Sequence, residues 1–201
     1  RLIPELNEGK PANLLDLDEE EKLRLKSFCL LSSKPMLYAC NLKEEEIIDP
    51  SANDKLVAFE QWANQQQDAT CCAISAKMEE ELSELEEAEA KEYLESMGVS
   101  DSGVTSLIKA CYDLLGLASY LTAGEKEARA WTFTKGMTAP QCAGVIHTDF
   151  EKAFIKAEVV SFDELIEAGS MQAARESGKL RLEGKEYLFA DGDVALFKCN
   201  A

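Results

Sequence analysis

The sequence predicts an α/β chain built from two units, a piece of a parallel sheet with helices followed by a small α+β unit. In residues 1–116, two short apolar runs alternate with segments of helical periodicity, as strand–helix–strand units do. After Gly116 the predicted strands become short and are separated by glycines. The charged residues are also distributed unevenly between the two units. Residues 1–116 hold 25 acids and 11 bases, whereas residues 117–201 hold 13 acids and 10 bases. We place the boundary near residues 117–122.

The first unit opens with an irregular segment over residues 1–16. Asp18 is then a helix cap, since Glu21 follows three residues later as in a capping box. Two apolar runs indicate buried strands. Later helices end at Gly98 and Gly116. The expected elements are helix 18–31, strand 34–40, helix 55–65 (Leu56, Phe59 and Ala63 inward), strand 70–74, helix 77–97 (Met78, Leu82, Leu85 and Leu94 inward) and helix 104–115 (Val104, Leu107, Ile108, Cys111 and Leu115 inward).

The second unit mixes short strands with two helices in about 80 residues, which is typical of a small α+β fold. The expected strands are 128–134, 154–160, 180–182, 187–189 and 194–197, and the expected helices are 139–146 and 162–168.

Composition excludes several classes of protein. A net charge of −17 argues against general attraction to nucleic acid or anionic lipid. The seven cysteines are odd in number and form no C-x-x-C, so we expect reduced thiols in the cytoplasm or a similar space. The sequence contains no run of ~18 apolar residues, so no membrane span is expected. The chain begins with Arg1 rather than Met, so we expect a processed or truncated product of a longer polypeptide.

Polar residues follow the two buried strands of the first unit. Asn41 comes directly after one strand and Ser75 after the other, and parallel strands present their carboxyl ends at one edge where ligands bind. An Asn side chain offers a donor and an acceptor to a purine, and the backbone N–H of Ala76 is a further candidate contact. The alternative is that Asn41 and Glu44 only shape a turn and cap the next segment.

The segment after the first strand is N-L-K-E, residues 41–44, where GTPases carry N-K-x-D. The aspartate of that motif accepts two hydrogen bonds from guanine N–H groups. Here Leu42 replaces the lysine and Glu44 carries one more methylene than aspartate. Adenine lacks the two guanine donors, so the change argues against guanine specificity.

Three segments carry a resemblance to a known family. They are LSSKPMLYACNLKE at residues 31–44, TAGEKEARAWT at residues 122–132 and APQCAGVIHTDFE at residues 139–151. With them, the chain resembles the YchF-type Obg-like ATPases over nearly its whole length. The resemblance implies a partial Ras-like P-loop nucleotide-binding domain and then a TGS domain with a β-grasp, ubiquitin-like fold. In that family residues 1–30 would end a helical coiled-coil arm, 31–116 would form the C-terminal half of the nucleotide domain, and 117–201 the TGS domain.

The resemblance also implies a function: hydrolysis of ATP in preference to GTP with Mg²⁺, and association with the ribosome through its large subunit. Asn41, Leu42 and Glu44 fall on the base-recognition segment, and Ser75 and Ala76 on the last nucleotide motif. The chain has no G-x-x-x-x-G-K-[ST], so we assign no catalytic residue or metal ligand and expect no hydrolysis by this chain alone. The alternative function is a non-enzymatic adaptor that binds RNA, ribosome or protein through the TGS domain. We expect a cytoplasmic protein; an organellar copy stays open.

Other residues have two interpretations each. His147, the single histidine, is expected to order a turn, since no partner stands at metal-ligand spacing. Residues 79–95 carry nine glutamates and one lysine, which indicates a solvated helix face or a docking surface for a basic partner. The adjacent Cys71 and Cys72 are expected to fill core space. The candidate RNA contacts of the second unit are Lys152, Lys156, Arg175, Lys179, Arg181 and Lys185.

Overall fold

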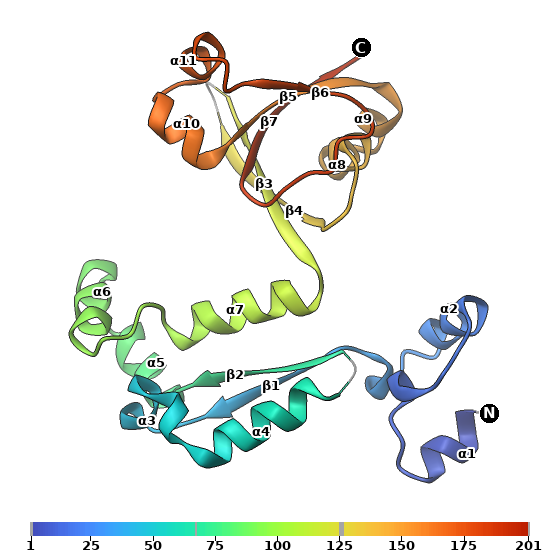
Figure 1. The fold of residues 1–201 in the computed structure, drawn as a ribbon, viewed down its shortest axis with the longest axis vertical. Helices are drawn as coiled ribbons and strands as arrows, with labels where there is room; N and C mark the ends of the chain where they lie inside the picture. Colours follow the sequence, from blue (N-terminus) through green and yellow to red (C-terminus); the bar gives the residue numbers. More distant parts are fainter. Residues whose placement is uncertain (1, 67, 125–126, 201) are drawn as a thin grey trace. The chain divides into compact units, whose positions relative to one another are not determined.

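The computed structural model describes residues 2–66, 68–124 and 127–200 (Figure 1). The chain divides into two compact units, Arg1–Leu115 and Gly116–Ala201. Within the described residues, no helix is both long enough and apolar enough to cross a membrane.

The first unit is built on two parallel strands, β1 (Met36–Asn41) and β2 (Ala69–Ile74). The pairing runs in register from Met36 opposite Ala69 to Asn41 opposite Ile74. Helix α4 (Asp54–Asn64) makes the crossover between them, and α7 (Gly103–Leu114) lies on the opposite side of the sheet (Figure 1). The predicted strand–helix–strand arrangement and the helix before Gly116 are therefore confirmed. Gly116 has φ +63°, a left-handed conformation that suits a helix end.

The core of the first unit lies between this sheet and its helices. Leu56 and Ala63 of α4 are buried as predicted, and so are Met78 and Leu82. The predicted burial of β1 is wrong, because each of its residues is either exposed or half-buried and Met36 is 40% exposed. The described residues form a sheet of only two strands here, so the second edge of β1 has no neighbour and part of its surface stays open. The predicted inward positions Val104, Ile108, Leu115 and Leu85 are also exposed.

The predicted single helix over residues 77–97 is wrong. The structure has two helices, α5 (Ala76–Ser83) and α6 (Glu87–Ser96), with a break between them. The backbone of Glu86 is extended and its N–H donates to Glu89, which starts the second helix. The break lets the hydroxyl of Tyr93 donate to Glu81 at 3.2 Å, whereas twelve residues of a straight helix span ~18 Å.

The remaining elements of the first unit are short. The capping box of Asp18 and Glu21 is confirmed, although its helix ends at Ser27 rather than near residue 31. Bounds are α1 Leu2–Asn7, α2 Glu19–Ser27 and α3 Glu44–Ile48, with 3₁₀ turns at Ala12–Leu14, Leu31–Ser33 and Pro50–Ala52.

The second unit is a five-stranded mixed sheet with the order β4-β3-β7-β5-β6. Its first and last strands, β3 and β7, are parallel neighbours, and the other pairs are antiparallel. This arrangement confirms the predicted β-grasp fold. Strand bounds are β3 Leu117–Ala123, β4 Ala128–Thr134, β5 Phe154–Ser161, β6 Arg181–Glu183 and β7 Asp193–Cys199; helix bounds are α8 Ala139–Ile146, α9 Thr148–Ala153, α10 Phe162–Ala168 and α11 Met171–Glu176.

Three features of the second unit differ from the sequence prediction. Strand β3 and the helices α9 and α11 were not predicted. The predicted strand at residues 187–189 is wrong, since this segment forms only one isolated bridge, Thr138 to Leu188. Its backbone bonds go instead to the turn before α8: the C=O of Tyr187 accepts from Ala139, and the N–H of Phe189 donates to Met137.

Two apolar clusters hold the second unit together, one on each face of the sheet. The larger centres on Tyr120, which is fully buried and donates its hydroxyl to the C=O of Cys142 at 2.8 Å. The rings of Phe189, Phe197 and Phe133 lie 5.2, 5.7 and 5.8 Å from that of Tyr120. The smaller cluster packs α10 and α11 against the other face through Val160, Ala174 and Val194.

Burial of acidic groups in the second unit predicts loss of stability at alkaline pH. Burial raises the pKa of the Cys142 thiol from 9.0 to about 12, and burial with the hydrogen bond to Asp193 raises the pKa of Tyr187 from 10.0 to about 12. Both groups are held protonated in the folded state, so the unfolded state releases protons first as the pH rises. The stabilisation is complete below pH 9 and is lost between pH 9 and about 12.

We therefore expect the free energy of unfolding of the second unit to fall steadily above pH 9. Urea titrations at pH 8, 9, 10 and 11, followed by Trp131 fluorescence, measure it. Cys142→Ala should reduce the part of the decline that begins near pH 9 and keep the part due to Tyr187. A free energy of unfolding that stays level from pH 8 to 11 contradicts this prediction.

Candidate nucleotide-base site at the strand ends

Asn41 and Ser75 stand side by side at the carboxyl ends of β1 and β2. Asn41 is the last residue of β1 and pairs with Ile74, the last residue of β2, so Ser75 follows directly. Ser75 is 3% exposed, and its hydroxyl caps α5 by accepting from the N–H of Met78 at 3.5 Å. Two parallel strands with a short turn into α5 therefore bring together residues that lie 34 positions apart in the sequence.

The side chain of Asn41 joins the two strand ends. Its Oδ1 accepts a hydrogen bond from the backbone N–H of Ala76 at 3.0 Å. The N–H of Ala76, which the sequence offered as a contact for a base, is therefore already donated to Asn41. Asn41 is exposed, and within the described residues its Nδ2 amide has no protein partner. The arrangement leaves an amide donor at the sheet edge, held in place by the bond through its oxygen.

Glu44 and Lys77 form an ion pair beside Asn41. Glu44 begins α3, and its Oε1 accepts from the Nζ of Lys77 at 2.6 Å. The hydrogen bond and the charge of Glu44, followed by the charge of Glu81, raise the pKa of Lys77. Lys77 was not among the site residues predicted from the sequence, although it follows Ser75 and Ala76 directly. Leu42 is half-buried and its N–H donates to Ile74 at 2.8 Å.

These residues surround a small pocket of about 290 Å³, near the lower end of the usual range for small-molecule sites. Its lining is Asn41, Leu42, Lys43, Glu44, Glu45, Ser75 and Lys77. The lining offers an amide, an apolar side chain and charges of both signs, a set that suits one edge and one face of a heteroaromatic base. Within the described ranges, no group of three or more His, Cys, Asp or Glu residues could hold a metal ion.

The histidine and the small residues of the 139–151 motif have structural roles. The Nδ1 of His147 accepts from the N–H of Asp149 at 3.3 Å and caps α9, which confirms that His147 orders a turn. A Cβ on Gly144 would lie 3.0 Å from the carboxylate of Glu151, so glycine permits the close approach of α9 to α8. Glu125 and Lys126 of the 122–132 motif lie outside the described residues.

Several candidate RNA contacts of the second unit are paired with carboxylates. Arg175 binds Glu158 at 2.8 Å, Lys179 binds Glu167, and Arg181 lies 3.4 Å from Asp193. Lys156 of β5 is different, because it stands directly opposite Lys198 of β7 and both side chains are exposed. Like charges in such positions repel each other, so this pair suits an anionic neighbour.

Comparisons with known proteins agree with this architecture. A family model named YchF-GTPase_C, described as "Protein of unknown function (DUF933)", matches residues 117–200. The chain is 49% identical, over 95% of its length, to the ribosome-binding ATPase YchF of Bacillus subtilis and covers 52% of that protein. It is 43% identical over 92% of its length to the same protein of Mycoplasma genitalium, of which it covers 50%. The solved structure of the Schizosaccharomyces pombe YchF GTPase superposes with a TM-score of 0.76 at 35% identity, covering 96% of this chain and 50% of that one.

The fold and the strand-end site together define a class: part of a Ras-like P-loop α/β domain joined to a β-grasp unit. Similarity runs through both units and extends over nearly the whole chain. Residues 117–200 match the YchF C-terminal family model, and nearly the whole chain is similar in sequence and fold to YchF proteins. It spans about half the length of the curated relatives it matches.

Proposed function

We propose that this chain supplies the base-recognition side of an ATP-hydrolysing, ribosome-associated protein. The observation that carries the proposal is the bond between Asn41 and Ala76, which fixes an amide donor at the edge where two parallel strands end. The names of the relatives, ribosome-binding ATPases, support the nucleotide and the partner. The 201 residues contain no G-x-x-x-x-G-K-[ST], so residues outside this chain would hold the phosphates and Mg²⁺. Hydrolysis by this chain alone is not expected.

In this proposal Asn41, Leu42 and Glu44 select the base, while Ser75 and Ala76 hold the turn behind it. The Nδ2 of Asn41 donates to a ring nitrogen of the purine, and Leu42 gives the ring an apolar contact. The Glu44 carboxylate is already engaged by Lys77, so it accepts poorly from the two N–H groups of guanine. Adenine lacks these two N–H donors and needs no carboxylate acceptor, so ATP is preferred to GTP.

The open surfaces of the first unit support a domain that continues beyond this chain. One edge of β1 pairs with no described strand, and Ile108 of α7 is 54% exposed. We propose residues 31–116 as the later half of the nucleotide domain, residues 1–30 as the end of a helical arm, and residues 117–201 as the TGS domain. Further strands of the longer protein would cover the open edge.

The ribosome is the proposed partner, through its large subunit, and the cytoplasm the proposed location. RNA contact would fall on the TGS sheet, where the exposed Lys156 and Lys198 stand opposite each other. A phosphate backbone relieves that repulsion.

A second candidate function is a TGS adaptor that works without nucleotide. The contacts of Asn41 with Ala76 and of Glu44 with Lys77 favour it, because both side chains then have a purely structural role. Nucleotide titration separates the two functions.

The test is a calorimetric titration of ATP and GTP into the polypeptide that includes the preceding half. We expect ATP to bind at least ~10-fold more tightly than GTP. Leu42→Lys with Glu44→Asp should move the preference toward GTP by ~10-fold to 100-fold, the scale of one bidentate contact to a base. The control is Glu80→Asp, which shortens an exposed glutamate of α5 outside the pocket lining. Equal or tighter GTP binding by the unchanged protein contradicts the specificity, and binding of neither nucleotide favours the adaptor.

A further inference from the structure

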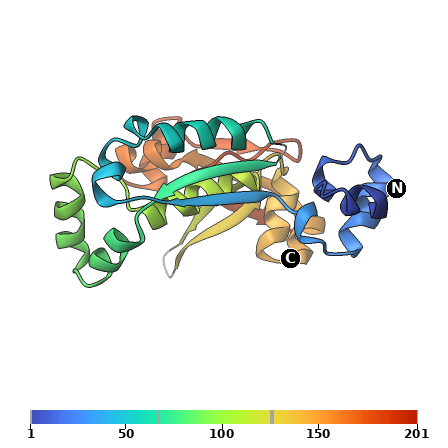
Figure 2. The same cartoon turned by 90° about the horizontal axis from the view of Figure 1, so that it is seen from below.

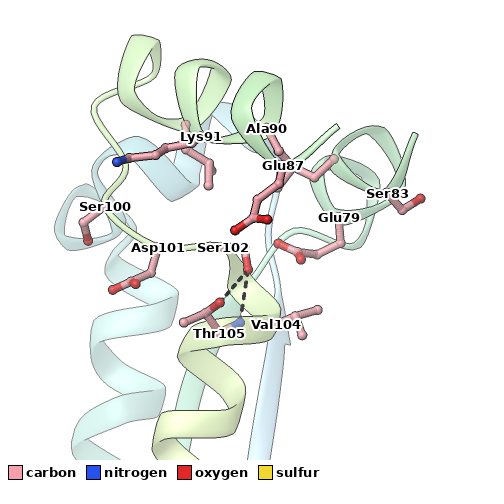
Figure 3. A pocket seen from close by; sticks show the side chains of 12 residues that line it. Glu79, Ser83, Glu87, Ala90, Lys91, Ser100, Asp101, Ser102, Val104 and Thr105 are labelled. Carbon is pink, nitrogen blue, oxygen red and sulfur yellow. Dashed lines mark hydrogen bonds between the residues drawn. The ribbon is translucent and has the colours of Figure 1, made fainter. Parts of the chain in front are cut away.

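A second hollow of the first unit is larger than the base site. It has a volume of about 660 Å³ and lies between α5, α6 and the start of α7 (Figure 3). Four aliphatic side chains form its apolar part: Leu82, Ala90, Leu94 and Val104. Val104 is 50% exposed, although the sequence pattern predicted it to point inward. We call this hollow the α5–α7 groove.

One carboxylate of the α5–α7 groove has no partner. Glu79 accepts from the N–H of Gly103 at 2.6 Å, and Asp101 binds Lys109 at 2.9 Å. Glu87 has no hydrogen bond or ion pair with any described residue, and its carboxylate points into the space between α6 and the start of α7 (Figure 3). Lys91 lies at 3.9 Å from Glu95 of its own helix. An unneutralised negative charge therefore stands next to an apolar surface.

The charge around the α5–α7 groove selects the kind of partner. Residues 79–101 contain ten carboxylates and a single lysine. Such a density attracts cations and repels phosphate groups, so RNA does not fit this surface. A basic peptide fits it, because aliphatic side chains can cover the apolar part while a Lys or Arg meets Glu87.

We propose that the α5–α7 groove docks a basic, amphipathic segment of a partner protein. Leucine-like side chains one helical turn apart would pack on Leu82, Leu94 and Val104, and a neighbouring cation would pair with Glu87. The surface is separate from the base site, whose lining residues it does not share. Its occupancy requires neither nucleotide nor ribosome.

The first experiment measures binding of a fluorescent helical peptide with Leu and Lys at i and i+4 spacing to the 201-residue chain by anisotropy. We expect saturable binding that weakens by ~10-fold in Glu87→Lys, since a lost charge contact is replaced by repulsion. Glu92→Lys is the matched control. It makes the same charge change on α6 at a residue outside the groove lining, and its affinity should stay within ~2-fold.

A second pair of variants tests the geometry of the site. A peptide in which Glu replaces the groove-facing Lys should bind Glu87→Lys more tightly than it binds the unchanged chain. Val104→Ser, at a site that is 50% exposed, should weaken binding of the original peptide while the circular dichroism of the chain stays the same. The proposal is overturned by an absence of saturable binding, by equal losses in Glu87→Lys and Glu92→Lys, or by displacement of the peptide by an RNA oligonucleotide. Self-association of the chain that is abolished by Glu87→Lys also overturns it, because a second copy then fills the groove.

Discussion

Tyr120→Ala is expected to unfold the second unit, or to bring it close to unfolding, at room temperature. Tyr120 is fully buried, packs against Phe133, Phe189 and Phe197, and anchors α8 through Cys142. Truncating a buried aromatic side chain to alanine costs about 3–5 kcal/mol. A domain of this size has a total stability of ~5–15 kcal/mol, so the loss removes a large part of it.

Urea unfolding followed by tryptophan fluorescence measures this effect. Trp131 reports on the second unit, and a Trp62→Phe background removes the signal of the first. Tyr120→Phe is the matched control, because it keeps the ring and removes one buried hydrogen bond, which costs about 1 kcal/mol. If Tyr120→Phe is as destabilising as Tyr120→Ala, the hydroxyl rather than the packed ring is the main contributor, and the prediction is wrong.

Asp193→Ala is expected to have the next largest effect, a loss of about 3–5 kcal/mol in the stability of the second unit. Asp193 is 2% exposed at the start of β7. Its carboxylate accepts from the hydroxyl of Tyr187 at 2.8 Å and the N–H of Ala190 at 2.9 Å, and Arg181 lies at 3.4 Å. Removing it leaves these donors without their acceptor in a buried place.

The measurement is the same urea titration, with Glu186→Ala as the control. Glu186 is an exposed carboxylate near the same strands, and its loss should change the free energy of unfolding by less than about 0.5 kcal/mol. Similar small effects in Asp193→Ala and Glu186→Ala would mean that the buried carboxylate contributes little net stability.

Features set by local sequence were predicted well. The capping box of Asp18 and Glu21, the helix at residues 139–146 and the glycine that ends α7 all depend on neighbours within four residues. Alternation of apolar runs with helices was also sufficient to predict parallel pairing. Since parallel strands end at one edge, the proximity of Asn41 and Ser75 followed from topology.

Features set by distant residues were missed. The ion pair of Glu44 with Lys77 joins positions 33 apart, and nothing in the sequence around either residue predicts which partner it binds. The break between α5 and α6 brings Tyr93 back to Glu81, a contact that helical periodicity does not predict. Burial of β1 was predicted from its apolar residues, but burial needs neighbouring strands, and the described chain gives β1 only one.

The parallel contact of β3 with β7 has a consequence for synthesis of the protein. The strand that occupies the middle of the five-stranded sheet is also the last one translated, and it separates β3 from β5. Until residues 193–199 leave the translating ribosome, β3 pairs only with β4 and β5 only with β6. The central strand that joins these two pairs into one sheet is not yet available. Folding of this unit should therefore be late and cooperative rather than progressive, and a nascent chain halted before residue 193 would remain open to chaperones and proteases.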